Sequence, residues 1–272
     1  MCTIMRETEP IRTPKVKESL QTRIFGRPLH CFRELTSTND MAKELALIGA
    51  REGTVIAAET QTKGRGRLKR EWVSQKGGVW LSIILRPKTE PKHAPKLTLM
   101  ASVAVAKTIS KLFRLKTEIK WSNDVLIHQK KVCGILTEAR TKREALDFVI
   151  VGIGINANFS AEALPLYLRG SSTTLKEEFK REIQRESLVC TLLEETEFYY
   201  DLFKEGGFDT ILKEWRVLAS FLGSYVEIMS GGEKIEGWAT DIDGDGALMV
   251  KLRDQTVHRV TSGDLTVLKI KE

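Results

Sequence analysis

The chain has 272 residues, 42% of them hydrophobic, which is enough for one large domain with a packed core or for one domain and a small module. Lysine and arginine number 43 against 36 aspartate and glutamate residues, and the net charge of +7 suits nucleotides, polyphosphates or an acidic protein as well as nucleic acid. The four cysteines are far apart, no N-terminal run resembles a signal peptide and no apolar stretch could cross a bilayer, so we expect a cytoplasmic protein without disulfides, zinc or membrane contact.

The first twenty residues carry Pro10, Pro14 and several charges without a sustained hydrophobic period. We therefore predict a loosely ordered tail at 1–20, which is too short to be a DNA-binding domain. An extended apolar stretch begins near Gln21 and leads into the polar run TSTN at 36–39.

After this polar run, apolar residues recur at helical spacing until Gly49, which predicts a helix. Ser37 and Asp40 have the spacing of a capping box at the start of that helix. A helix start also presents free backbone N–H groups to a ligand, so the same residues could both cap the helix and bind.

The segment from Glu59 to Trp72 reads ETQTKGRGRLKREW and follows a strand that we predict at 54–60. Its glycines reach backbone dihedrals that other residues avoid, and its arginines present forked donors that can hold a carboxylate or a phosphate. Taken alone, the run is better interpreted as a solvated basic turn than as an anion clamp.

A second strand is predicted at 77–85, and residues 96–113 are apolar nearly all round, which indicates a buried helix. The densest polar cluster of the chain, KWSND at 120–124, lies between two short apolar strands. A basic turn at 129–131 then enters another apolar strand at 132–138.

An apolar strand from Phe148 runs into GIGIN at 152–156, which fits the dinucleotide fingerprint G-x-G-x-x-A. That fingerprint should open a helix in an early βαβ unit, whereas this segment comes late in the chain and is followed by no helix pattern. We therefore reject a Rossmann fold.

The remainder of the chain predicts two helices, at 187–203 and 208–222, and then a change to short strands. Glycine-containing turns separate the strands, which favours a small barrel. The predicted strands are 225–229, 235–242, 247–252, 256–261 and 265–270.

Four of these segments occur together, in the same order, in one known family: TSTN at 36–39, Gln61 with GRGR at 64–67, KWSND at 120–124, and GIGIN at 152–156. The chain resembles the biotin protein ligases, also called holocarboxylase synthetases, over about residues 21–272. The resemblance implies an α+β fold. A catalytic domain at 21–221, related to class II aminoacyl-tRNA synthetases, would have a mixed sheet flanked by helices, and an SH3-like β-barrel would follow at 222–272.

The resemblance also implies the reaction. The enzyme would activate biotin with ATP and Mg²⁺ as biotinyl-5'-AMP, release pyrophosphate, and transfer biotin to a lysine of an acceptor such as the carboxyl carrier subunit of acetyl-CoA carboxylase. Positioning two anions and stabilising phosphoryl charge are the protein's tasks, which explains the basic residues and the absence of a nucleophile motif. The winged helix of some bacterial members is missing, so we expect no sequence-specific DNA binding, and two copies could pair as a homodimer.

The matching residues receive roles from the family. The ureido head of biotin would be held by Ser37, Thr38, Asn39 and Gln61. The loop of Gly64, Arg65, Gly66 and Arg67 would close over the acyl chain and the adenylate. Lys131 would lie between the biotin carboxylate and the α-phosphate, and the catalytic charges would be Lys131, Arg67 and Lys120.

Other matching positions would serve the nucleotide. Arg70, Lys120, Asn123 and Asn156 would contact it, Asp124 would contact the magnesium ion, and Trp72 would cover adenine. Backbone approach to the ligand would be allowed by Gly134, Gly152 and Gly154, and Trp80 would wall the biotin pocket.

Two positions depart from the family pattern. Ser122 stands where the family has proline, which loosens a fixed φ angle but removes no functional group. Lys69 stands where the family commonly has glycine, and it therefore bears on how the loop closes.

Two other functions remain open from the sequence. A lipoate–protein ligase or octanoyl transferase shares the superfamily, although a dithiolane offers no urea to the polar residues at 36–39; competition by biotin or lipoate in ATP–pyrophosphate exchange separates the two. A nucleic-acid-binding regulator is suggested by the charge and would show salt-dependent duplex binding unaffected by biotin.

Overall fold

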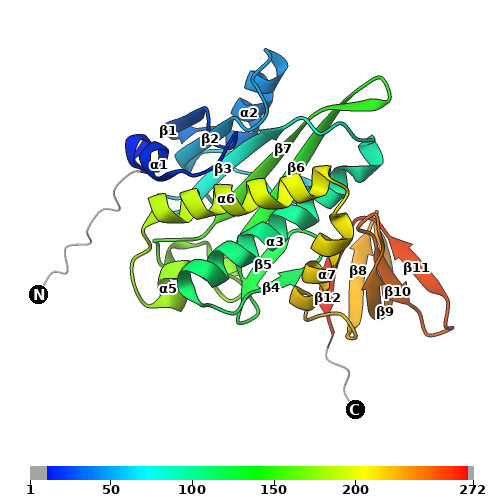
Figure 1. Cartoon of the computed structure of the whole chain (residues 1–272). Coiled ribbons are helices and arrows are strands. Elements are labelled where there is room, and N and C mark those ends of the chain that lie inside the picture. The colour runs from blue at the N-terminus through cyan, green and yellow to red at the C-terminus, as the bar shows by residue number, and fades with distance from the viewer. Residues whose placement is uncertain (1–10, 269–272) are drawn as a thin grey trace, which may run out of the picture.

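The computed structural model describes residues 11–268. Its centre is a seven-stranded sheet with the strand order β1-β2-β3-β7-β6-β5-β4 (Figure 1). The β1 and β2 strands are parallel and the other neighbours are antiparallel, so the sheet is mixed. The strands are β1 Leu29–Leu35, β2 Val55–Gln61, β3 Val79–Leu85, β4 Glu118–Lys120, β5 Asp124–Ile127, β6 Lys130–Lys142 and β7 Ala145–Ile155.

Helices cover the sheet and connect its strands. In Figure 1, α3 and α6 lie side by side across one face of the sheet. The helices are α1 Thr13–Ser19, α2 Thr38–Leu47, α3 Ala94–Phe113, α4 Leu166–Arg169, α5 Leu175–Phe179, α6 Arg185–Lys204 and α7 Phe208–Leu218. None of the helices between residues 11 and 268 combines the length and the apolar character needed to span a membrane.

The two faces of the sheet are filled differently, because successive side chains on a strand point in opposite directions. On β7, Val151 and Ile153 belong to the main core beneath α3, whereas Phe148 and Ile150 pack in a separate cluster with Ala42 of α2. Thus α3 and α2 lie on opposite faces.

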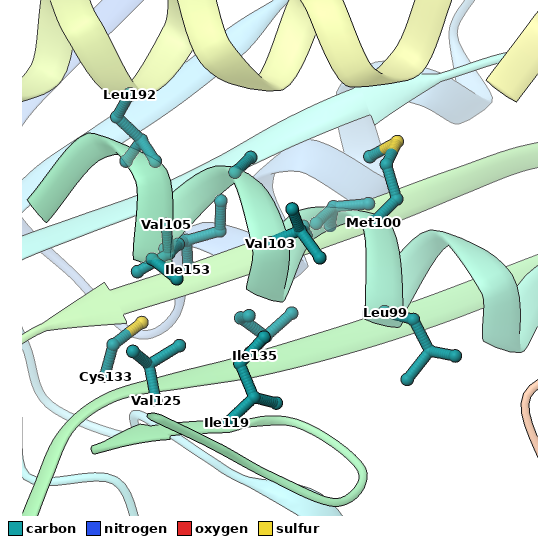
Figure 2. Close-up of a cluster of buried hydrophobic side chains, with 14 of the residues drawn as sticks. Leu99, Met100, Val103, Val105, Ile119, Val125, Cys133, Ile135, Ile153 and Leu192 are labelled. Carbon is teal, nitrogen blue, oxygen red and sulfur yellow. The ribbon is translucent and has the colours of Figure 1, made fainter. Parts of the chain in front are cut away.

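The main core is packed between α3, α6 and the sheet. In Figure 2, Val103 and Val105 of α3 lie between Leu192 of α6 and the strand residues Ile135 and Ile153. All five side chains are at most 2% exposed. The prediction of a buried helix at 96–113 is confirmed, since this helix has apolar neighbours above and below it.

A second, five-stranded antiparallel sheet follows α7, with the order β11-β10-β9-β8-β12. Its residues Val226, Ile228 and Leu248 belong to the same core as the main sheet, and the Trp121 indole nitrogen donates to the Gly246 carbonyl oxygen at 3.2 Å. The strands are β8 Tyr225–Ser230, β9 Glu233–Ile242, β10 Leu248–Lys251, β11 Val257–Val260 and β12 Asp264–Val267. The predicted α+β class is confirmed.

Two local predictions are wrong. The loose tail does not extend through 11–20, because Val16 of α1 and the following Leu20 are buried against α6, and Pro14 stands near the helix start, where proline is tolerated. Residues 1–10 of that tail lie outside the described part of the chain. Ser37 is the N-cap residue of α2 but makes no side-chain capping bond, and Asp40 pairs with Arg65 instead.

One buried ion pair fixes the end of β2. This end leads into the loop of residues 64–67, which we call the Gly/Arg loop. Arg185 of α6 donates to the Glu59 carboxylate at 2.9 Å and to the Gly78 carbonyl oxygen at 2.9 Å, and its side chain is 3% exposed. Glu59 also accepts a hydrogen bond from the backbone N–H of Ile11. Removing one partner would leave a buried charge without compensation.

We predict that Arg185→Ala lowers the free energy of unfolding by about 3–5 kcal/mol, because Glu59 would remain buried and charged. Urea unfolding of the wild type and variant measures the difference. The matched control is Lys204→Ala at the other end of α6, whose partly exposed ion pair with Asp201 should contribute less than about 1 kcal/mol. Equal effects of the two substitutions would contradict the structural role of Arg185.

Candidate functional site

A pocket of about 1150 Å³, its open mouth included, lies on the face of the sheet opposite α3. It is formed where the Gly/Arg loop, the start of α2 and strands β6 and β7 meet. Of the residues predicted from the sequence, sixteen line it: Ser37, Thr38, Asn39, Gln61, Arg65, Gly66, Arg67, Arg70, Trp72, Asn123, Asp124, Lys131, Gly134, Gly152, Gly154 and Asn156.

One end of the pocket is lined by uncharged polar side chains, of which Asn39 also donates to the Glu138 carboxylate at 2.6 Å. Thr38 and Asn39 are each 4% exposed, so their polar atoms are held in fixed directions. The Thr38 backbone N–H donates to Gln61 Oε1 at 2.7 Å, and the Gln61 amide nitrogen donates to Ser74 Oγ at 2.7 Å. Ser82 Oγ lies 2.6 Å from Asn39 Oδ1. Buried donors and acceptors of this kind suit a neutral ligand with both donors and acceptors.

Two paired glycines form the floor of the middle of the pocket. Gly134 and Gly154 face each other across β6 and β7, and the indole of Trp72 lies over both. A Cβ atom on Gly154 would lie 2.5 Å from the indole nitrogen, and one on Gly134 would lie 2.7 Å from a ring carbon. Gly152 similarly makes room for the Asn39 amide. These glycines therefore leave space for two side chains of the protein, those of Trp72 and Asn39.

The other end of the pocket carries positive charge. Lys131 Nζ lies 2.7 Å from Asp124 Oδ1 and 5.0 Å from the Trp72 ring centroid. The backbone of Lys131 is also fixed, since its N–H donates to the Ser171 carbonyl oxygen at 2.8 Å. The Lys131 ammonium group is thus oriented within the pocket by a carboxylate and an aromatic face.

Two arginines of the loop add to this charge. Arg67 donates to Ser122 Oγ, and to Asn123 Oδ1 at 3.3 Å, so these two partners are neutral. Burial lowers the pKa of the Arg67 guanidinium, and the carboxylates of Asp264 and Asp124 oppose that shift. Arg70 pairs with Asp264, which belongs to β12 of the second sheet.

Arg65 lies in a different setting from Arg67. Its guanidinium forms ion pairs with Asp40 and Glu138, and the hydrogen bonds that it donates to Asp40 raise its pKa. The carboxylates that the Arg65 guanidinium binds are therefore side chains of the protein itself, those of Asp40 and Glu138.

Three predicted residues do not line the pocket. Lys120 lies on β4, behind its hairpin partner Asp124. Gly64 is buried, and a Cβ atom there would lie 2.4 Å from the Trp72 carbonyl oxygen and 2.6 Å from Ser74 Oγ. Trp80 is fully buried and packs edge-on against Trp72 with ring centroids 6.3 Å apart, so it supports the indole that lines the pocket instead of walling it.

Several lining residues were missed by sequence reasoning. Most are apolar residues whose only signal was the strand or loop that carries them: Val73, Leu81, Ile135, Leu136, Ile153, Leu164 and Leu168. The polar ones are Glu71, Ser172 and Asp264. Asp264 is 194 residues from its partner Arg70, and no local pattern could have linked the two.

Both departures from the family pattern have a structural counterpart. Lys69 has a φ of 59°, in the left-handed region that favours glycine, as does its neighbour Leu68 with 53°. The loop therefore keeps the backbone of a glycine-containing turn although a lysine occupies it. Ser122 supplies a hydroxyl group that accepts a hydrogen bond from Arg67, which a proline could not do.

We predict that Gly154→Ala lowers the free energy of unfolding by about 1–3 kcal/mol, because the added methyl group overlaps the Trp72 indole and must displace it. Urea unfolding, with near-ultraviolet circular dichroism as the probe of tryptophan packing, measures both effects. Gly170→Ala is the control, since no atom lies within 4 Å of its Cβ position. An unchanged tryptophan signal in Gly154→Ala would contradict the stacked position of the indole.

Comparisons with known proteins agree on one family. Residues 31–156 match the Biotin/lipoate A/B protein ligase family, and residues 221–265 match the Biotin protein ligase C terminal domain. The bifunctional ligase/repressor BirA of Bacillus subtilis is 34% identical over 263 residues, which cover 96% of this chain and 81% of that protein. The biotin–acetyl-CoA-carboxylase ligase of Mycobacterium tuberculosis is 30% identical, with 97% of this chain and 100% of that protein covered.

A solved structure shows the same fold. The biotin protein ligase of Aquifex aeolicus, in complex with biotin and ATP, superposes with a TM-score of 0.75 at 28% identity. The similarity covers 89% of this chain and 98% of that one.

Proposed function

The chain belongs to the biotin protein ligase family and is a biotin ligase, and from this premise we propose that it joins biotin to AMP and then to a lysine of an acceptor protein. In the first step the biotin carboxylate would attack the α-phosphorus of ATP, giving biotinyl-5'-AMP and pyrophosphate. In the second, an acceptor lysine would attack the mixed anhydride and release AMP. The name of the Mycobacterium tuberculosis relative supports acetyl-CoA carboxylase as the acceptor. Within that enzyme, we propose the carboxyl carrier subunit.

The observation that carries this proposal is the division of one pocket into a neutral polar end and a cationic end. Biotin is divided in the same way, with an uncharged ureido ring at one end and a negatively charged carboxylate at the other. Thr38, Asn39 and Gln61 would hold the ring, since their amide and hydroxyl groups match its donors and acceptors. A dithiolane ring offers no comparable donors and acceptors to these groups, which disfavours lipoate.

Lys131 and Arg67 would stabilise the charge that grows on the phosphoryl oxygens. Arg67 is half-buried with neutral partners, and a phosphate anion beside it would oppose the effect of burial, which lowers its pKa. Lys131 lies at the cationic end of the pocket with its ammonium group already oriented, so it needs little rearrangement during the reaction. Trp72 covers the glycine floor next to Lys131 and would pack against the adenylate.

The residues that line the pocket could hold a magnesium ion that enters bound to ATP. No group of three or more acidic, histidine or cysteine side chains that could hold a metal occurs within residues 11–268, so this part of the chain offers no complete cage. Asp124 lines the pocket and would supply one carboxylate, which together with phosphate oxygens is a common way for proteins to bind Mg²⁺. The ion would neutralise part of the triphosphate charge.

The domain bounds, the oligomeric state and the lack of DNA binding are also proposals. The catalytic domain would span 21–221 and the SH3-like module 222–272, with the sheet of β8 to β12 as its framework. A homodimer and the lack of sequence-specific DNA binding remain predictions, which sedimentation and duplex binding at several salt concentrations would test.

The function is tested by incubating the protein with biotin, MgATP and a biotin-acceptor domain, and measuring the acceptor's mass. We expect the mass of one biotinyl group to be added, and none when lipoate replaces biotin. Addition of lipoyl or octanoyl groups without biotinylation would overturn the proposal in favour of the alternative ligase.

We predict that Lys131→Ala slows biotin-dependent ATP–pyrophosphate exchange by about 100-fold or more, because a preorganised charge is lost where negative charge develops. The matched control is Lys130→Ala, the preceding residue, which is exposed and does not line the pocket. Exchange by Lys131→Ala at the wild-type rate would refute the assigned role.

A further inference from the structure

The two arginines that flank Gly66 make opposite kinds of contact. Arg65 donates from Nη1 to Asp40 Oδ2 at 2.8 Å and from Nη2 to Asp40 Oδ1 at 2.7 Å, a bidentate pair. Its Nη2 also lies 3.0 Å from both carboxylate oxygens of Glu138. Arg67, in contrast, faces the pocket with the neutral partners Ser122 and Asn123.

Arg65, Asp40 and Glu138, which we call the Arg65 bridge, join three separate elements. Asp40 lies in the first turn of α2, Glu138 lies on β6, and Arg65 lies in the loop between β2 and β3. The residue pair Arg65 and Glu71 also forms an isolated antiparallel bridge, so the loop folds back on itself at this position. The Arg65 bridge therefore holds the base of a hairpin-like loop to the body of the protein.

Glu138 also connects this bridge to the polar end of the pocket. Its Oε2 accepts a hydrogen bond from Asn39 Nδ2 at 2.6 Å, and the other end of that amide, Oδ1, lies 2.6 Å from Ser82 Oγ. The amide of Asn39 is thus oriented by a carboxylate on one side and a hydroxyl group on the other. A change at Arg65 reaches Asn39 through a single shared side chain.

Moving Arg65 onto a substrate anion would require several charge-assisted hydrogen bonds to break at once. The three side chains of the bridge are 30%, 42% and 36% exposed for Arg65, Asp40 and Glu138, so each ion pair alone is weakened by solvent. Bidentate geometry and a shared network make the set stronger than isolated surface pairs. Arg67, with neutral partners, can turn to an anion more easily.

We propose that Arg65 is a positioning residue, which through Asp40 and Glu138 fixes both the loop at 62–72 and the Asn39 amide, and that substrate anions are bound by Arg67, Arg70 and Lys131. This inference rests on the proposed function, because it assigns the polar end to biotin and the cationic end to ATP. It distinguishes two arginines that the Gly-Arg-Gly-Arg pattern makes equivalent.

The first test is a comparison of kinetic constants in ATP–pyrophosphate exchange. Arg65→Gln and Asp40→Asn should each raise the KM for biotin by roughly tenfold and leave the KM for ATP within about threefold, a loss equivalent to one charge-assisted hydrogen bond. The double variant should be no worse than the worse single variant, since both substitutions break the same bridge. Arg67→Gln should instead lower kcat. A raised KM for ATP or a lowered kcat in Arg65→Gln, with the KM for biotin unchanged, would overturn the proposal.

Two further variants, Arg65→Lys and Lys63→Gln, separate the effect of the Arg65 bridge from that of positive charge in the loop. In Arg65→Lys the positive charge is kept but the bidentate guanidinium is lost, so we expect a KM for biotin between those of the wild type and Arg65→Gln. Lys63 is an exposed cation of the same loop that does not line the pocket, and its loss should leave both KM values unchanged. An equal effect of Lys63→Gln and Arg65→Gln would mean that only loop charge matters, against the bridge.

A second readout needs no activity. Amide hydrogen exchange of residues 62–72 in the ligand-free protein should be faster in Arg65→Gln and Asp40→Asn than in the wild type or Lys63→Gln. If exchange changes in this way but the wild type does not use biotin, the bridge stands and the proposed function fails. If the wild type uses biotin and exchange is the same in all four proteins, the bridge fails.

Discussion

The site depends on how β6 and β7 alternate their side chains between two faces. Every second residue of β7 must fill the core under α3, and Val151 and Ile153 do so. The alternate residues of β7 are free of that demand, and where the pocket lies they are Gly152 and Gly154. Large side chains on one face and glycines on the other therefore give a firm sheet with a hollow above it, into which Asn39 and Trp72 fit.

The positive charges around this hollow differ in how they are compensated. Carboxylates accompany three of them: Asp124 beside Lys131, Asp264 beside Arg70, and Asp40 with Glu138 beside Arg65. Arg67 has neutral partners instead and a lowered pKa. A pocket that must receive two anions cannot neutralise all its own cations, and it cannot leave all of them without compensation while empty. The arrangement meets both requirements by giving different partners to chemically identical groups.

Much of the fold followed from the sequence because its signals are local. The buried helix α3, the strands β2, β3 and β7 and the strands of the second sheet are marked by hydrophobic period and by turn residues, which need no knowledge of the rest of the chain. The short helix α1 was missed since one buried Val16 in two turns gives no period. Ser37 and Asp40 fitted a capping box in spacing, but the local rule could not include Arg65, which attracts Asp40 from another segment.

The site was predictable as a set of residues more than as a set of roles. Motifs named most of the lining residues, and both Trp72 and Trp80 were expected in the pocket wall. Only the packing shows that Trp80 is buried behind Trp72 and does not line the pocket.

Asp264 has a consequence for how the protein is made. It lies on β12, a strand that pairs with β8, and its carboxylate also reaches Arg70 in a loop 194 residues earlier in the chain. A nascent chain that has not yet reached Asp264 lacks one residue of the pocket lining, even when every strand of the main sheet has been synthesised. Complete assembly of the site therefore waits for synthesis of β12, and a product that ends before Asp264 would lack this carboxylate.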